Sequence, residues 1–212
     1  MMGYGSAMKR RMKSEERRAA IVAVAARLFA EKGFRGTTTR ELASILNVTE
    51  PVLYRHFRTK RDLYHAIIDA KAREGADAIA KLENWVDADD TAFLTRLGEH
   101  VLKHFEHDRN FVRLLLFSAL EGDELAHRFY DRQITPLYRM LAAFIKRRTG
   151  SGLFRDANVA IAARAFIGMV SYHGLASSLF RDRALPSDRR KLAAEMAAIF
   201  LDGLRAVPPN AH

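Results

Sequence analysis

Three histidines and three carboxylates are concentrated in one short stretch of the chain, and these residue types together can bind a metal ion. His100, His104 and His107 follow one another at helical spacing, which places neighbouring pairs on one side of a helix. All three together would span about 10 Å along a straight helix, which is too far for one ion. We therefore interpret this stretch as a solvated helix edge and predict no metal site.

Motifs for covalent or phosphoryl chemistry do not occur in the sequence. It has no nucleophile elbow, no phosphate-binding glycine loop, no HExxH pair and no clear pair of catalytic carboxylates. The absence of cysteine excludes a disulfide scaffold and a thiolate metal site, and it fits a cytoplasmic protein. We predict neither catalysis nor a cofactor.

Positive charge is concentrated at the N-terminal end of the chain. Residues 1–65 hold 14 Lys and Arg against 6 Asp and Glu, and the whole chain of 212 residues has a formal charge of +10. A basic end on a nearly neutral remainder indicates a polyanion-binding head on a body with another task. The most apolar stretch, residues 157–180, includes Asn158, Arg164 and His173, so we predict a buried helix and no membrane partner.

Apolar residues recur at helical spacing along the chain, so we predict an all-α fold. The first helix is expected over 15–32, from a cap at Ser14 to a break at Gly33. Residues 1–14 have no apolar run that would make a secretory signal, and we expect them to form a flexible basic arm. Two interpretations of this arm stay open, a solvated tail or insertion into a minor groove, and its basic residues are Lys9, Arg10, Arg11 and Lys13.

The next segment has the capping and turn residues of two short helices. Thr38 and Glu41 fit a capping box, in which each side chain accepts a hydrogen bond from the other residue's backbone N–H. Asn47 suits a tight turn because asparagine tolerates positive φ. Thr49 can cap the following helix, whose early Pro51 needs no N–H partner. With the first helix, this pair makes a three-helix head whose last helix is free to enter a groove of DNA.

This segment resembles the DNA-binding head of the TetR family of transcriptional regulators. The matching residues are Thr38, Ala43, Val48, the run from Leu53 to Phe57, and Lys60. The likeness extends in length and helix order over nearly the whole chain. Two departures are Asn47, where the family usually has glycine, and the acidic Glu50 near the start of the third helix.

The resemblance implies a regulator, more specifically a repressor, that binds a palindromic operator in double-stranded DNA as a homodimer. It also implies that a small-molecule effector releases the protein from DNA. The alternative is a DNA-binding regulator or architectural protein without an effector.

The residues of the head divide into those that position DNA and those that read it. Residues suited to phosphate oxygens are Thr38, Tyr54, His56 and Lys60, and the resemblance implies the same roles. Residues placed to meet base edges are Thr49, Glu50, Pro51, Val52 and Arg55. Arg55 suits a guanine, Glu50 a cytosine amino group, and Val52 or Pro51 a thymine methyl group. Two alternatives remain, simple packing for Tyr54 and a merely solvated charge for Arg55.

The head is predicted over 15–60, a helical effector-binding and dimerisation domain over 61–206, and a tail over 207–212. Further helices are expected at 59–84, 91–107, 109–120, 122–149 with a break at Pro136, 156–180 and 188–206. The side chains expected to face the effector are His104, Phe105, Tyr138, Phe166, Met169 and His173. Ordinary core packing is the alternative for each of them.

The last two predicted helices are rich in small and apolar residues, which are Ala160, Ala163, Gly168, Ser171, Leu192, Met196, Phe200 and Leu204. We predict that both helices pair with their symmetry mates in a two-fold dimer, as the family resemblance implies. A purely intramolecular bundle is the alternative.

Overall fold

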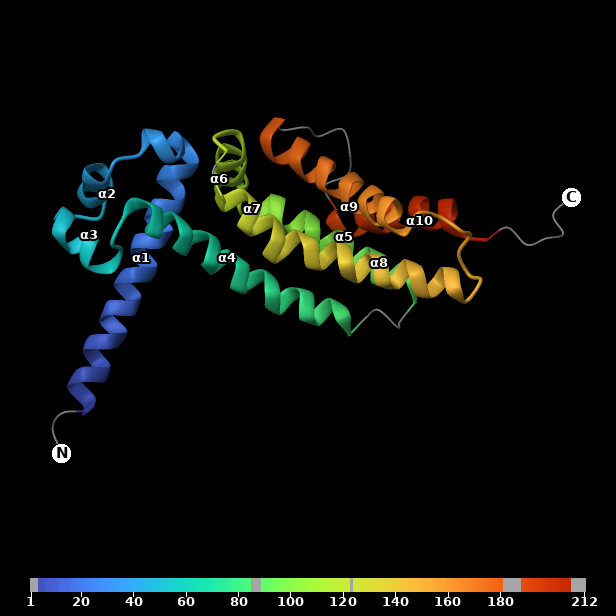
Figure 1. Cartoon of the computed structure of the whole chain (residues 1–212), viewed down its shortest axis with the longest axis horizontal. Coiled ribbons are helices and arrows are strands. Elements are labelled where there is room, and N and C mark those ends of the chain that lie inside the picture. Colours follow the sequence, from blue (N-terminus) through green and yellow to red (C-terminus); the bar gives the residue numbers. More distant parts are fainter. Residues whose placement is uncertain (1–3, 85–88, 123, 181–187, 207–212) are drawn as a thin grey trace, which may run out of the picture. The chain divides into compact units, whose positions relative to one another are not determined.

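The computed structural model describes residues 4–84, 89–122, 124–180 and 188–206 of the chain. The described residues contain helices and no β-strand; a single antiparallel bridge joins Phe154 to Arg205. The predicted all-α fold is therefore confirmed (Figure 1). The predicted tail at 207–212 lies outside the described residues.

The chain divides into two compact units, and each is described here by itself. Unit 1 comprises residues 1–73 and 110–129, and unit 2 comprises residues 74–109 and 130–212. Unit 1 therefore extends past residue 60, where the sequence placed the end of the head. The physical reason is that the first three helices do not bury a core on their own, and later segments complete it.

Unit 1 contains six helical segments. They are α1 (Tyr4–Gly36), α2 (Thr39–Ile45), α3 (Glu50–His56), the first part of α4 (Lys60–Glu83), nearly all of α6 (Arg109–Leu120), and α7 (Glu124–Phe129). Figure 1 shows α2 and α3 as two short helices joined by a tight turn. Most of the residues predicted to contact DNA lie on α3 or at its cap, whereas Thr38 caps α2 and Lys60 begins α4.

An aromatic cluster lies at the centre of unit 1. The ring of Tyr64 on α4 meets the ring of Phe29 on α1 edge to face, with centroids 4.9 Å apart. It also lies 5.0 Å from the ring of Phe34. The Tyr64 hydroxyl donates a hydrogen bond to the Leu114 carbonyl on α6 at 3.3 Å. The core of unit 1 therefore depends on α4 and α6 as well as on α1.

The N-terminal residues differ from the expectation of a loose arm. Residues 4–14 are helical and continuous with the rest of α1. The sequence between Ser6 and Lys32 contains neither glycine nor proline and is rich in strong helix formers. Ser14 therefore does not mark the start of the helix, because the residues before it form helix as readily as those after it. At its other end α1 continues past the predicted end at residue 32 to Gly36, across a kink at Gly33, whose left-handed φ of 72° was expected and favours glycine.

Unit 2 contains the end of α4 and four longer helical segments. They are α5 (Asp90–His107), a π-helical turn η1 (Tyr130–Ile134) leading into α8 (Thr135–Gly150), α9 (Val159–Leu175) with a π-helical turn η2 (Ala176–Phe180), and α10 (Arg189–Leu204). The Asp89 side chain caps α5 by accepting a hydrogen bond from the Ala92 backbone N–H at 2.8 Å. The predicted helix over 122–149 is split just before Pro136, as expected.

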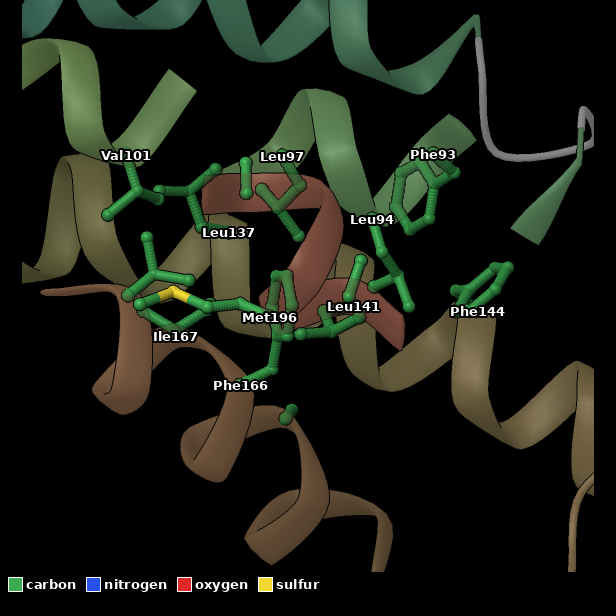
Figure 2. Packing of buried hydrophobic residues seen from close by; sticks show 14 of the residues in the cluster. Phe93, Leu94, Leu97, Val101, Leu137, Leu141, Phe144, Phe166, Ile167 and Met196 are labelled. Atoms are coloured by element: carbon green, nitrogen blue, oxygen red, sulfur yellow. The ribbon is translucent and has the colours of Figure 1, made fainter. Parts of the chain in front are cut away.

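The core of unit 2 is formed by side chains from α5, α8, α9 and α10. Figure 2 shows the inward side chains of these helices meeting one another, among them Leu97, Leu141 and Phe166. Helices α5 and α10 approach closely because Gly98 lies opposite Ala193. A Cβ added at Gly98 would stand 3.1 Å from the Ala193 Cβ.

One helical segment among the described residues, Val159–Phe180, has the length and apolar composition of a membrane span. Its Ala163, Phe166 and Val170 are buried in the core of unit 2. Core helices of soluble proteins meet the same criteria, so this segment alone does not indicate a membrane. The helix predicted to be buried is therefore buried along one side only, since Ile161 and Tyr172 are exposed.

Candidate nucleic-acid interface

The turn between α2 and α3 has the geometry that the sequence predicted. The Thr38 hydroxyl accepts a hydrogen bond from the Glu41 backbone N–H at 3.2 Å and so caps α2. Asn47 has a φ of 51°, which an asparagine adopts at lower cost than most residues. The Val48 backbone N–H then donates to the Ala43 carbonyl at 2.9 Å and closes the turn. These bonds fix the direction in which α3 leaves α2.

One half of the predicted capping box is replaced by a different contact. The Glu41 carboxylate accepts a hydrogen bond from the Lys32 ammonium group on α1, where a capping box would direct it to the Thr38 backbone N–H. This ion pair connects α2 to α1. Thr49 likewise occupies the cap position of α3, but its hydroxyl makes no capping hydrogen bond.

Helix α3 has one buried side and one accessible side. Leu53 and the following Phe57 are buried among the apolar residues of unit 1, while Thr49, Pro51 and Arg55 are exposed. Val52 is half-buried. The accessible residues belong to the set predicted to meet base edges, and they lie on a helix short enough to enter a major groove at its N-terminal end.

Glu50 is engaged within the protein. One oxygen of its carboxylate accepts a hydrogen bond from the Thr39 hydroxyl at 2.8 Å. The other oxygen lies 3.7 Å from the Arg40 Nε. The Tyr54 hydroxyl in turn donates to the Thr39 hydroxyl at 3.3 Å. Glu50 therefore holds α3 against the start of α2, and a base-reading role would require its carboxylate to share or leave these partners.

Tyr54 is not an ordinary core residue. Its side chain is 44% exposed, and its hydroxyl lies at the surface beside Thr39. Simple packing, one of the two interpretations of this residue, does not account for that exposure. The position fits a phosphate contact, as proposed for Thr38, which is also exposed.

Lys60 and His56 are both half-buried, and burial lowers the pKa of each side chain. The Lys60 ammonium group lies 4.2 Å from the centroid of the Phe34 ring, and the Glu121 carboxylate opposes the lowering of its pKa. The aromatic ring restrains the position of the Lys60 ammonium group.

Three guanidinium groups surround His56. Burial lowers the pKa of its imidazole below the ordinary value of 6.5. Nearby positive charges lower this pKa further, those of Arg17, Arg55 and Arg18 in that order. The Arg18 guanidinium also lies 4.7 Å from the centroid of the Phe57 ring. The result is a cluster of positive charge contributed by both α1 and α3.

The sequence analysis did not single out Thr39, Arg17 or Arg18. The two arginines follow Glu15 and Glu16 in a helix that is charged on several sides, so nothing local indicates that they lie near α3. Thr39 lies between Thr38 and Glu41, the two residues of the predicted capping box. Its role as a link between Glu50 and Tyr54 depends on contacts across 11 and 15 residues.

The residues expected to face an effector do not share one environment in unit 2. Phe166 is fully buried against Phe200, with ring centroids 5.1 Å apart, so ordinary core packing describes it. His104 is exposed. The other four residues are half-buried, namely Phe105, Tyr138, Met169 and His173.

Two of these half-buried residues have specific neighbours. The Arg164 guanidinium lies 5.1 Å from the centroid of the Tyr138 ring. Phe105 lies so close to α9 that a Cβ added at Gly174 would stand 2.5 Å from its ring. Phe105 and Tyr138 therefore both contact α9, on which Met169 and His173 also lie.

Among the residues of α9 and α10 that the sequence analysis emphasised, Ala160 and Gly168 are exposed and most of the others are not. Ala163, Leu192, Met196 and Leu204 are buried in the core of their own chain, and Phe200 packs against that core. The exposed large apolar side chains on these two helices are Ile161, Tyr172 and Ile199. Along α9, Ile161, Ala165, Gly168 and Tyr172 recur at helical spacing and are all exposed.

The chain matches two family models. The model for bacterial regulatory proteins of the tetR family matches residues 21–67. The model for the C-terminal domain of AefR-like transcriptional repressors matches residues 92–203, more than half of the chain. A relative from Bacillus subtilis (strain 168), the HTH-type transcriptional regulator YvkB, is 24% identical over 187 residues, which cover 88% of this chain and 96% of YvkB.

Solved structures with similar folds include two that contain ligands. A transcriptional regulator from Saccharomonospora viridis in complex with choline has a TM-score of 0.71, 21% identity, and coverage of 91% of this chain and 100% of that one. AibR in complex with isovaleryl coenzyme A and operator DNA has a TM-score of 0.66, 21% identity, and coverage of 86% of this chain and 97% of that one. At this identity the likeness establishes the fold alone.

The helix-turn-helix geometry of α2 and α3, the all-helical second unit and the two family matches agree with one another. The matched family consists of DNA-binding regulators rather than enzymes. The chain belongs to the TetR family of bacterial transcriptional regulators.

Proposed function

We propose that this regulator is a cytoplasmic repressor that binds a palindromic operator as a homodimer and is released by a small-molecule effector. The observation that carries the DNA-binding part is the accessible side of α3, where Thr49, Pro51 and Arg55 are exposed on a helix fixed by the α2–α3 turn. Tyr54, His56 and Lys60 adjoin this side with groups suited to phosphate oxygens.

The exposed apolar residues of α9 and α10 support the homodimer. Tyr172 and Ile199 are 73% and 67% exposed, and large apolar side chains are costly to leave in water. Gly168 and Gly203 have no atom within 4 Å of an added Cβ, so both helices also offer small positions to a partner helix. A two-fold dimer would present two α3 helices to half-sites about 34–36 Å apart.

The proposal that an effector binds has weaker support than the proposal that DNA binds. Similar structures have been solved with choline and with isovaleryl coenzyme A, which makes a small-molecule ligand a reasonable proposal for this chain. The buried Phe166 favours the alternative, a regulator or architectural protein without an effector. Selection of bound sequences from a random DNA pool, repeated with candidate ligands, distinguishes the two. If one ligand abolishes the recovery of bound DNA, the result supports a regulator that an effector releases from DNA. If selection is unchanged with every ligand, the result supports a DNA-binding protein without an effector.

Arg55→Ala should change base preference at one position of each half-site by about 1–3 kcal/mol. The guanidinium is exposed on the accessible side of α3 and is long enough to reach a base edge. Lys60→Ala and Tyr54→Phe should instead weaken binding to all sequences alike, and Lys60→Ala should lower the salt slope by about 1. Binding measured against a library of operator variants at several salt concentrations would separate these effects.

Arg58→Ala is the matched control for Arg55→Ala, since it removes an equally exposed charge just beyond α3. This control should leave the base preference at every position of the half-site unchanged. If Arg55→Ala did the same and only lowered affinity, the assignment of Arg55 to base reading would be wrong.

DNA affinity should rise as pH falls through the pKa that His56 has in the complex. In the free protein, burial and the three neighbouring arginines lower the pKa of His56, so its imidazole is neutral at pH 7. A nearby phosphate would favour the charged form and raise the pKa, so binding would take up a proton. As the pH falls, the gain in DNA affinity should begin near the pKa that His56 has in the complex. It should level off below the lower pKa that His56 has in the free protein. It should not exceed about tenfold per pH unit for each protomer.

Fluorescence anisotropy over a pH series would measure this dependence. His56→Gln should flatten the profile, whereas His107→Gln, which removes an exposed histidine of unit 2, should leave it unchanged. A profile that keeps its slope in His56→Gln would assign the proton uptake to another group.

A further inference from the structure

A polar cleft in unit 2 lies apart from the residues of the proposed DNA interface. It has a volume of about 270 Å³ and is formed by the end of α4, the middle of α5 and the first turn of α10. The residues that line it are Lys81, Leu82, Arg96, Glu99, His100, Lys103 and Arg189. None of the six residues predicted to face an effector is among them.

Positive charge dominates the cleft. Four of its side chains are cationic, and they come from three different helices, whereas Glu99 is the single carboxylate among the lining residues. Like charges placed together repel one another. An anion bound between them would relieve this repulsion.

Arg189 has an incomplete set of hydrogen bonds. Its Nη1 donates to the Glu106 Oε2 at 2.6 Å, which holds the guanidinium on the side of α5. Its Nε is buried and has no hydrogen-bond partner among the described residues. Buried N–H groups without partners destabilise a fold, and an oxygen-rich ligand in the cleft would supply an acceptor.

His100 adds hydrogen-bonding capacity without adding charge. Burial lowers its pKa to about 4, with smaller contributions from His104 and Lys103. At neutral pH the imidazole is therefore uncharged and offers one N–H donor and one acceptor nitrogen. The charged and titratable groups that line the cleft with it are Lys81 of α4, Arg96, Glu99 and Lys103 of α5, and Arg189 of α10.

We propose that this cleft binds a small polyvalent oxyanion, specifically a ligand with a diphosphate group. With Glu99 in the lining and Glu106 paired to Arg189, the four cationic side chains keep a formal excess of two positive charges, of which a single carboxylate would balance one. An apolar molecule would gain little from a lining with one leucine. A diphosphate carries several negative charges in a group small enough for the cleft, and cationic side chains from α4, α5 and α10 can each contact a different oxygen. The proposal is independent of the DNA interface, because no residue of α2 or α3 takes part.

The test is calorimetric titration of inorganic pyrophosphate into the full chain without DNA, at constant ionic strength. Saturable binding of one pyrophosphate per chain is expected. Arg96→Gln/Lys103→Gln should weaken it at least about tenfold, because two charge-assisted hydrogen bonds are removed. Arg139→Gln/Lys146→Gln removes the same charge from exposed positions on α8 outside the cleft and should change the affinity less than about twofold.

The pKa of His100 provides a second readout, because bound pyrophosphate should raise it. Histidine NMR resonances followed over a pH series, with and without pyrophosphate, would measure this change. Absence of saturable binding would overturn the proposal. Equal weakening in the two double variants would also overturn it, since that result is expected from general attraction to a basic protein. Circular dichroism of each variant would verify that it is folded.

Discussion

Tyr172→Glu/Ile199→Glu should convert the protein to a monomer and lower its affinity for a palindromic operator by about 10²–10⁴-fold. Both side chains are exposed apolar groups on the helices proposed to form the dimer interface. Burying two carboxylates in each protomer's half of that interface would cost far more than it gains. The large loss of affinity follows because each head would then bind its half-site separately.

Sedimentation velocity at micromolar concentration and operator binding would measure the two effects. Ala143→Glu/Leu153→Glu is a control with the same added charge, placed at exposed positions of unit 2 outside α9 and α10. The control should remain dimeric and bind DNA nearly as well as the unmodified chain. If the Tyr172→Glu/Ile199→Glu variant stays dimeric, the interface must lie on another surface. If the unmodified chain is monomeric, the proposed dimer is wrong.

Tyr64→Ala should destabilise the protein by about 3–5 kcal/mol, the range found for buried aromatic residues replaced by alanine. The ring is 1% exposed and packs between Phe29 and Phe34, so its removal leaves a cavity shared by α1 and α4. The hydrogen bond from its hydroxyl to Leu114 is lost as well. DNA binding should fall with stability, because the same core supports α2 and α3.

Urea unfolding followed by circular dichroism would measure this change. Tyr64→Phe removes the hydroxyl and keeps the ring, so it should cost about 0.5–1.5 kcal/mol. Tyr54→Ala makes the same change as Tyr64→Ala at a largely exposed position and should cost less than about 1 kcal/mol. Equal effects of Tyr64→Ala and Tyr54→Ala would contradict the central place of Tyr64 in unit 1.

The helix-turn-helix could be predicted because its geometry is set by rules that act within a few residues. A threonine cap, a turn asparagine with positive φ and an early proline each restrict the local backbone, and Thr38, Asn47 and Pro51 occupy the expected positions. The contacts of Glu41 with Lys32 and of Glu50 with Thr39 span 9 and 11 residues. No local rule specifies them, so both carboxylates were assigned other partners.

The faces of α9 and α10 show a different limit of sequence analysis. Helix α9 is apolar on nearly all sides, so its periodicity does not indicate which side turns inward. Ala163 and Met196 were therefore expected at a dimer interface, although they lie in the core of the chain. Only the packed structure separates them from Tyr172 and Ile199.

The division of the chain into units has a consequence for building hybrid regulators. Unit 1 takes its core from the N-terminal residues and from the later segment 110–129. A fusion that joins residues 1–60 to a foreign effector domain would discard Tyr64 and Leu114 and would expose the apolar surface that they cover. A transplantable DNA-binding module would have to include α6 and α7, or the recipient would have to supply helices of matching shape.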